Sequence, residues 1–141
     1  MCRIRARARP NQPISAVMST ARGFPGPDEV ARKCRLLDEL CEKNGRDPTS
    51  LVRTANVAFY MGADERGAAR ARQALAEWGA RAAGRTGFLT GTPREATDLV
   101  AQYREAGVAR LSIGLRAPFD WDALHAYAEQ VLPAFGVKPA R

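Results

Sequence analysis

The feature that most limits how this chain can fold is a capped amphipathic helix that runs directly into an apolar strand. Thr92 is a good N-cap, Pro93 stands at the first helical position, and Glu95 is placed to reach back to the Thr92 amide. Gly107 ends the helical pattern, and residues 108–115 then alternate as an apolar strand. A helix followed at once by such a strand is the repeating unit of α/β proteins, so the sequence predicts that architecture.

The first half of the chain contains a similar helix and strand. Residues 1–27 are rich in proline without a sustained period, and we expect coil there. A helix is expected from residue 28, and its apolar face is predicted to contain Val30, Cys34, Leu36, Leu37, Leu40 and Cys41. Gly45 is a plausible stop for this helix, and residues 51–60 alternate as a strand.

Two more helices complete the pattern. Asp64 is placed to cap a second helix, whose apolar face is predicted to contain Ala68, Ala71, Leu75 and Trp78. A short extended piece is expected at residues 88–89. A last helix is predicted from about Asp120 to just before Pro133, and its buried residues are predicted to be Leu124, Tyr127, Ala128 and Val131. We interpret Trp78 and Trp121 as helix-packing residues.

The order of these elements predicts an α/β fold with parallel strands. Helices that alternate with nearly continuous apolar strands favour parallel pairing through right-handed crossovers. Two or three strands are too few to close a barrel. The residues by themselves therefore leave two arrangements open, which are part of a barrel and a small open sheet.

Length, composition and cysteine content narrow the class of protein. The 141 residues, 45% of them hydrophobic, are enough for one domain with a core. The apolar runs are shorter than the roughly 20 residues of a membrane span, and the N-terminus lacks the apolar region of a secretory signal. Cys34 and Cys41 are seven residues apart, which matches no common zinc site. We therefore expect a soluble cytoplasmic protein with reduced thiols, no metal site and no membrane partner.

The positive charge is concentrated at the N-terminus. The formal net charge is +7, and residues 1–23 carry five arginines and no acid. An Arg-rich arm of this kind is able to contact phosphates without sequence preference, although an unstructured leader without a partner is the alternative. Because the remaining residues carry little net charge, we rank nucleic-acid binding below the other interpretations.

Three sequence blocks carry a resemblance to a known family. They are residues 28–48, which end in Gly-Arg-Asp-Pro, residues 91–108, which begin with Gly-Thr-Pro-Arg-Glu, and residues 128–133, which read Ala-Glu-Gln-Val-Leu-Pro. In this order and at these separations they resemble the C-terminal end of luciferase-like monooxygenases, which are flavin- or deazaflavin-dependent oxidoreductases with a (β/α)8 barrel. The resemblance covers about residues 24–139, and we assign residues 24–141 to this part of a barrel domain.

The resemblance has consequences for fold and chemistry. It implies that residues 51–60 and 108–115 are the seventh and eighth strands, so that the chain supplies the last two or three β/α units of a truncated barrel. It implies FMN or a deazaflavin, coenzyme F-420, as cofactor and a small molecule as substrate. In the family most contacts to the ring and substrate come from earlier strands, so no residue is assigned a catalytic role.

The same resemblance offers an explanation of the arm. Residues 19–24 stand where family members have an Ala-Asp-Gly-Trp-type motif. An abrupt loss of resemblance beside an Arg/Ala/Pro-rich stretch is what a frameshift or a misplaced start produces in GC-rich DNA. We therefore expect residues 1–23 to be a disordered segment unrelated to the family.

Candidate binding residues follow from where barrel enzymes place their sites, at the C-terminal ends of the strands. Gly114 and Arg116 are the candidates for cofactor binding, because glycine permits close approach and arginine grips phosphate. Asn56 and Tyr60 are the candidates for substrate binding. Each has a plainer interpretation, since Arg116 also suits a solvated loop and Asn56 a structural amide. His125 falls in the middle of a helix and is expected to be at the surface or half-buried, without a catalytic role.

These observations lead to one main hypothesis and two alternatives. The main hypothesis is a C-terminal fragment of a luciferase-like oxidoreductase, inactive or weakly active alone. Its exposed strand edges are expected to cause self-association. The alternatives are a non-catalytic α/β interaction module and a nucleic-acid-associated protein that uses the Arg-rich arm.

Overall fold

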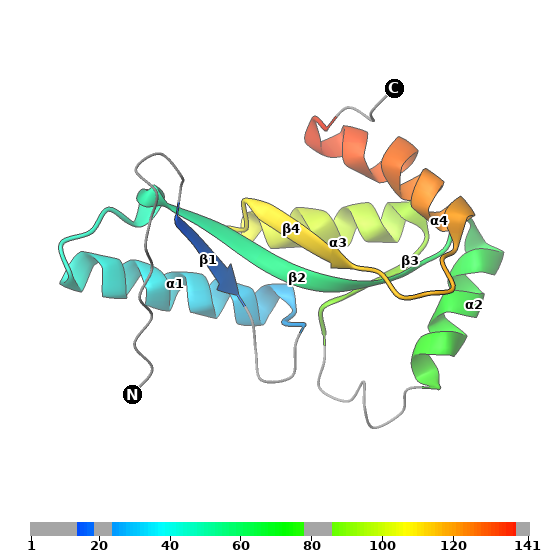
Figure 1. Ribbon diagram of the computed structural model, residues 1–141, viewed down its shortest axis with the longest axis horizontal. Coiled ribbons are helices and arrows are strands. Elements are labelled where there is room, and N and C mark those ends of the chain that lie inside the picture. Colours follow the sequence, from blue (N-terminus) through cyan, green and yellow to red (C-terminus); the bar gives the residue numbers. More distant parts are fainter. Residues whose placement is uncertain (1–13, 19–23, 78–85, 138–141) are drawn as a thin grey trace.

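The protein forms a parallel sheet with helices packed against it (Figure 1). The structure is a computed structural model that describes residues 14–18, 24–77 and 86–137. The elements are, in order, β1 (Ile14–Met18), α1 (Pro27–Lys43), η1 (Pro48–Ser50), β2 (Leu51–Met61), α2 (Glu65–Ala76), β3 (Phe88–Gly91), α3 (Pro93–Glu105), β4 (Arg110–Gly114), α4 (Trp121–Ala126), η3 (Tyr127–Val131) and η4 (Leu132–Phe135). From α1 onward this order confirms the predicted alternation of helices and strands.

Strand β2 is the centre of the sheet. Its residues 51–55 pair with β1, residues 58–61 pair with β3, and residues 54–58 pair with β4, all in parallel. Because the stretch that binds β4 overlaps the other two, β4 lies along one edge of β2, and β1 and β3 lie along the other. The four described strands form an open sheet, which is consistent with part of a barrel of alternating strands and helices.

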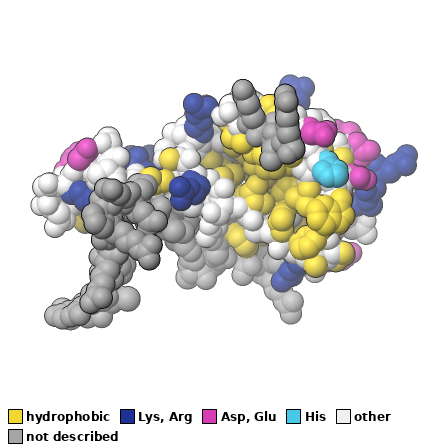
Figure 2. Space-filling view, turned by 45° about the horizontal axis from the view of Figure 1, so that its top comes forward, with side chains coloured by type: hydrophobic (Ala, Val, Ile, Leu, Met, Phe, Trp, Pro, Cys, Tyr) yellow, Lys and Arg dark blue, Asp and Glu magenta, His cyan; other side chains and the backbone are white. Residues whose placement is uncertain are grey.

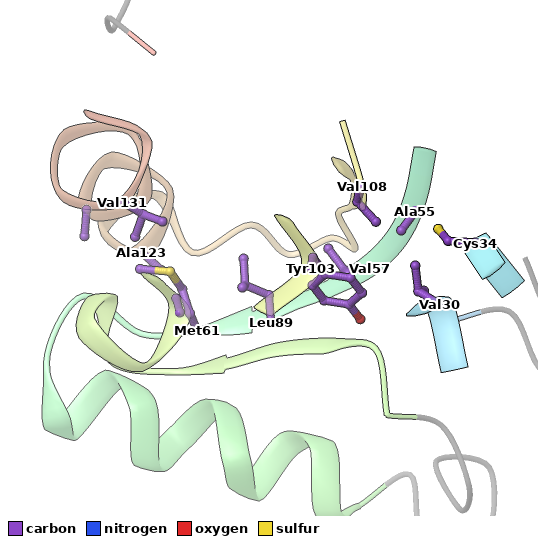
Figure 3. Close-up of a cluster of buried hydrophobic side chains, with 12 residues drawn as sticks. Val30, Cys34, Ala55, Val57, Met61, Leu89, Tyr103, Val108, Ala123 and Val131 are labelled. Carbon is purple, nitrogen blue, oxygen red and sulfur yellow. The ribbon is translucent and has the colours of Figure 1, made fainter. Parts of the chain in front are cut away.

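One face of β2 is buried under three helices. Figure 3 shows this core, in which side chains from α1, α3 and α4 meet Ala55, Val57 and Met61 of β2. Tyr103 of α3 lies in the middle of the core with 1% of its surface exposed, and its hydroxyl donates a hydrogen bond to the carbonyl oxygen of Pro25 at 2.6 Å. This hydrogen bond within the core therefore connects the turn before α1 to α3 in the second half of the chain.

The predicted helix starts are confirmed. The Asp64 carboxylate accepts a hydrogen bond from the Gly67 amide at 2.7 Å and caps α2. At α3 both halves of the capping box are present, since Thr92 accepts from the Glu95 amide and Glu95 accepts from the Thr92 amide. Asp120 caps α4 in the same way. These contacts join residues three positions apart, which is why the local sequence is enough to predict them.

The expectation of coil over residues 1–27 is wrong at one described segment. Ile14–Met18 forms strand β1, which pairs with the N-terminal half of β2. Five residues are too few to show a period, and their pairing partner lies far along the chain. The strand is stabilised by this long-range ladder, which the local sequence does not contain.

The predicted apolar face of α1 is too wide. Val30, Cys34 and Cys41 are buried, whereas Leu36 and Leu40 are 55% and 47% exposed. The buried positions of this helix recur every three or four residues and therefore form one narrow stripe. Both leucines fall outside that stripe.

The C-terminal helix also differs from its prediction. It does not stop before Pro133 but continues as the π-turn η3 and the 3-10 turn η4. Pro133 is tolerated because it stands at the start of η4, where its missing N–H is not needed. The buried residues of this segment are Ala123, Ala126 and Val131. Trp121 is 63% exposed and does not pack as predicted, and Trp78 lies outside the described residues.

Candidate functional site

An open groove of about 410 Å³ lies where β2 and β4 end. Its walls come from the end of β2, from one face of α2 and from the loop between β4 and α4. The lining residues are Phe59, Tyr60, Met61, Gly67, Arg70, Ala71, Ala74, Glu77, Leu115, Arg116, Ala117, Pro118, Phe119, Asp120 and Leu124. Parallel strands bring their carboxyl ends to one edge of the sheet, and α/β proteins bind ligands at that edge.

Two of the four residues predicted from the sequence meet in this groove. Tyr60 comes from the penultimate position of β2, and Arg116 comes from the loop after β4. Burial raises the pKa of the Tyr60 phenol, and the positive charge of Arg116 partly offsets that rise. The Tyr60 ring also packs edge-to-face on Phe88, with ring centroids 5.8 Å apart. Tyr60 is therefore a protonated hydrogen-bonding group beside a guanidinium at neutral pH.

The other two predicted residues lie in the same pair of strands but do not line the groove. Asn56 stands opposite Ser112 in the ladder, and Gly114 stands opposite Ala58. A Cβ at Gly114 would lie 3.4 Å from the Val57 carbonyl oxygen and 3.7 Å from the ring of Phe24. The glycine permits a close approach here, and the approaching groups belong to the protein itself.

The α2 wall of the groove is the part that sequence reasoning missed. Gly67, Arg70, Ala71 and Ala74 recur at three or four residues, so they share one face of the helix. This spacing is visible in the sequence. The spacing does not tell which part of the protein this face contacts, because the orientation of α2 is set by its packing against β2 and β3.

The groove carries charge of both signs and has an apolar rim. Arg70 and Arg116 are the cations, and Glu77 and Asp120 are the acids. The Asp120 carboxylate is engaged at the start of α4, where it accepts a hydrogen bond from the Ala123 amide at 3.0 Å. Arg116 is the cation that the loop after β4 contributes to the lining of the groove.

Exposed aromatic side chains stand beside the groove. Phe119 is 45% exposed and packs edge-to-face on Trp121, with centroids 5.8 Å apart. Leu115, which also lines the groove, is 49% exposed. Figure 2 shows hydrophobic side chains gathered on this face of the molecule, next to the histidine. His125 is exposed, as the sequence predicts.

Within residues 14–18, 24–77 and 86–137, no group of three or more His, Cys, Asp or Glu side chains is arranged to hold a metal ion. Among the helices described there, none combines the length and apolar character that crossing a membrane requires.

Comparison with solved structures identifies the fold. No protein-family model matches the sequence, and no curated protein matches it. The structure is similar to a long-chain alkane monooxygenase, LadA, with a TM-score of 0.62 and 14% identity over 90% of this chain and 38% of that one. It is also similar to the monooxygenase RslO1 from Streptomyces bottropensis, with a TM-score of 0.55 and 23% identity over 86% of this chain and 41% of that one.

These likenesses show that the chain has the fold of part of such monooxygenases. It spans 38% and 41% of the length of the two structures. Both the α/β class and the relation to a larger enzyme fold agree with the sequence prediction.

Proposed function

We propose that this chain is the C-terminal part of a luciferase-like, flavin- or deazaflavin-dependent monooxygenase. The groove at the ends of β2 and β4 is then the portion of the cofactor and substrate site that this chain supplies. One observation carries the proposal: Tyr60 and Arg116, which come from different strand ends, line a single groove. The fold likeness to two monooxygenases supports it.

The residues present suit the phosphate-bearing end of such a cofactor. A volume of about 410 Å³ lies in the range of small-molecule sites. Arg116 would hold a phosphate with paired N–H donors, and Phe59 and Leu115 would offer apolar contact. When bound, a flavin or deazaflavin supplies the hydride or electron transfer of the reaction.

The side chains of this protein would bind and orient ligands, while the cofactor would carry out the redox chemistry. Arg116 would bind and orient an anionic group, and the Tyr60 phenol, which is protonated at neutral pH, would donate a hydrogen bond. The groove is open on one side, so the described residues exclude water from only part of it. We therefore expect the 141-residue chain by itself to show weak turnover or none.

Comparing FMN with riboflavin tests the proposal, because the two share a ring and differ by one phosphate. We expect FMN to bind about tenfold more tightly, a difference of about 1.4 kcal/mol for one charge-assisted contact. The measurement is flavin fluorescence during titration, with coenzyme F-420 titrated in parallel to distinguish the two cofactor types.

The matched variants are Arg116→Gln and Arg94→Gln, which remove the same charge. Arg94 is exposed on α3 and does not line the groove. Arg116→Gln should abolish the preference for FMN, and Arg94→Gln should retain it. Equal effects of both variants, or no saturable binding of any of these cofactors, would contradict the proposal. Tightly bound stoichiometric flavin in the purified protein would instead contradict the expectation of a weak site.

A further inference from the structure

A second groove, of about 470 Å³, lies at the other end of β4. It is enclosed by the last turns of α3, the start of β4 and the C-terminal segment η3–η4, which runs back above α3 and β4 in Figure 1. Its apolar walls are Val100, Val108, Leu111, Leu132, Phe135 and Val137. The groove described above opens beyond the C-terminal end of β4, so the two are separate sites on the same strand.

The polar groups of this second groove are two arginines and a tyrosine. Arg104 and Arg110 line it, and both side chains are exposed. In the described part of the chain, neither guanidinium makes an ion pair, and the Tyr127 hydroxyl makes no hydrogen bond. Arg104 of α3, Arg110 of β4 and Tyr127 of η3 thus each bring an unused hydrogen-bond donor to the second groove.

The sign of the charge distinguishes this groove from the first. The first groove is lined by two acids, Glu77 and Asp120, as well as by two arginines, whereas among the described residues no acidic residue lines the second groove. The dipole of α3 favours a cation at Arg104 in its last turn, but it does not account for Arg110 at the start of the next strand. The second groove therefore combines apolar walls with two uncompensated positive charges.

We propose that this second groove binds an amphipathic anion, with an aliphatic chain against its apolar walls and a carboxylate held by Arg104 and Arg110. Guanidinium groups bind carboxylates through paired N–H donors, and the apolar walls remove the chain from water. The Tyr127 hydroxyl supplies a further donor. This inference does not depend on the proposed oxidoreductase function.

Titration calorimetry with decanoate, kept below its micelle concentration, tests the proposal. We expect saturable binding of one molecule per chain. Acetate, which has the same head without the chain, and decyltrimethylammonium, which has the chain with the opposite charge, should each bind at least tenfold more weakly. Equal binding of the cation, or no saturable binding of decanoate, would overturn the proposal.

A pair of double variants separates the site from general attraction to a basic protein. Arg104→Gln with Arg110→Gln should weaken decanoate binding at least tenfold. Arg66→Gln with Arg94→Gln removes the same charge from exposed positions outside both grooves and should change it less than twofold. Equal losses in both double variants would overturn the proposal.

A third variant keeps the test valid if the double change disturbs folding. Val137 is 47% exposed at the edge of the groove, so Val137→Glu places an acid there without altering the core. We expect it to weaken decanoate binding at least fivefold, with an unchanged circular dichroism spectrum. Unchanged affinity in a folded Val137→Glu protein would contradict the site.

Discussion

Tyr103 shows how a single side chain holds distant segments together. It is fully enclosed by the core, and its hydroxyl donates to the Pro25 carbonyl across 78 positions of sequence. Burial raises the pKa of Tyr103 to about 12. Both observations mean that the Tyr103 side chain is protonated in the folded protein.

Replacing Tyr103 by phenylalanine should destabilise the protein and also remove a pH dependence. At pH 7 we expect Tyr103→Phe to lower the free energy of unfolding by about 1–3 kcal/mol, because the buried Pro25 carbonyl loses its donor. In the parent protein the folded pKa lies above the unfolded value of about 10, so the contribution of this group is complete below pH 10.

That contribution falls by about 2–3 kcal/mol as the pH rises from about 10 towards about 12. Urea unfolding of both proteins between pH 7 and 11.5 measures the difference. If the free energy of unfolding of Tyr103→Phe falls equally over this pH range, Tyr103 is not the source of the pH dependence.

Gly62 is a residue where space, not conformation, requires glycine. Gly62 lies in the turn from β2 to α2. A Cβ there would lie 2.1 Å from backbone atoms of Gly67 and of Ala68 in α2. We expect Gly62→Ala to lower the free energy of unfolding by about 3 kcal/mol or more, since neither backbone atom is free to move.

Gly45 is the control for this prediction. It has φ of +65° with open space around it, so Gly45→Ala should cost only about 1–2 kcal/mol of strain. Chemical denaturation of both variants makes the comparison. A smaller effect at Gly62 than at Gly45 would contradict the packing of the turn.

At the scale of elements, α3 depends on contacts at its first turn. Glu95 accepts a hydrogen bond from the Thr92 amide at 2.8 Å and lies 2.7 Å from Arg72 of α2. The hydrogen bond from the Thr92 amide is the main reason that the pKa of Glu95 is lowered. The carboxylate therefore stabilises the fold above its unfolded pKa, and this contribution is lost as the pH falls through the folded value.

The cap should matter more than the salt bridge. We expect Thr92→Ala to lower the free energy of unfolding by about 1 kcal/mol, because the Glu95 amide loses its acceptor. Arg72→Ala should cost about 0–1 kcal/mol, because both partners of its ion pair are about half exposed. Urea denaturation at pH 7 compares the two, and a larger loss in Arg72→Ala would contradict this order.

At the scale of the whole molecule, the sheet is open at β4. This strand pairs with β2 on one side, and the residues that the structure describes place no strand on its other side. Exposed strand edges of this kind pair readily with other chains. We therefore propose that copies of this chain associate through the edge of β4.

Sedimentation velocity over a range of protein concentrations tests this association. Ser112 is exposed in the middle of β4, and Ser112→Lys should shift the protein towards monomer, because a charge at the edge disfavours pairing. Gln102→Lys adds the same charge on an exposed position of α3 and should leave the association unchanged. A protein that is monomeric at every concentration would contradict the proposal.

The candidate site divides between what local sequence predicts and what it does not. Tyr60 and Arg116 can be predicted from the sequence, because Tyr60 lies at the end of one recognisable strand, Arg116 follows another, and parallel strands end at the same edge of a sheet. Arg70 and the rest of the α2 wall were not predicted, because a helical face does not reveal its partner. The second groove was missed for the same reason, since Arg104 and Arg110 acquire common surroundings only when the C-terminal segment folds back.

The α/β alternation and the starts of the helices follow from the local sequence. Caps such as Thr92 with Glu95, and apolar periods within one helix or strand, act over a few residues and are present in the sequence. By contrast, packing between distant segments is needed to explain why Ile14–Met18 pairs with β2, why Leu36 is exposed, and which side chains line each groove. These outcomes depend on strand register and helix orientation, which are set by contacts between residues far apart in the chain.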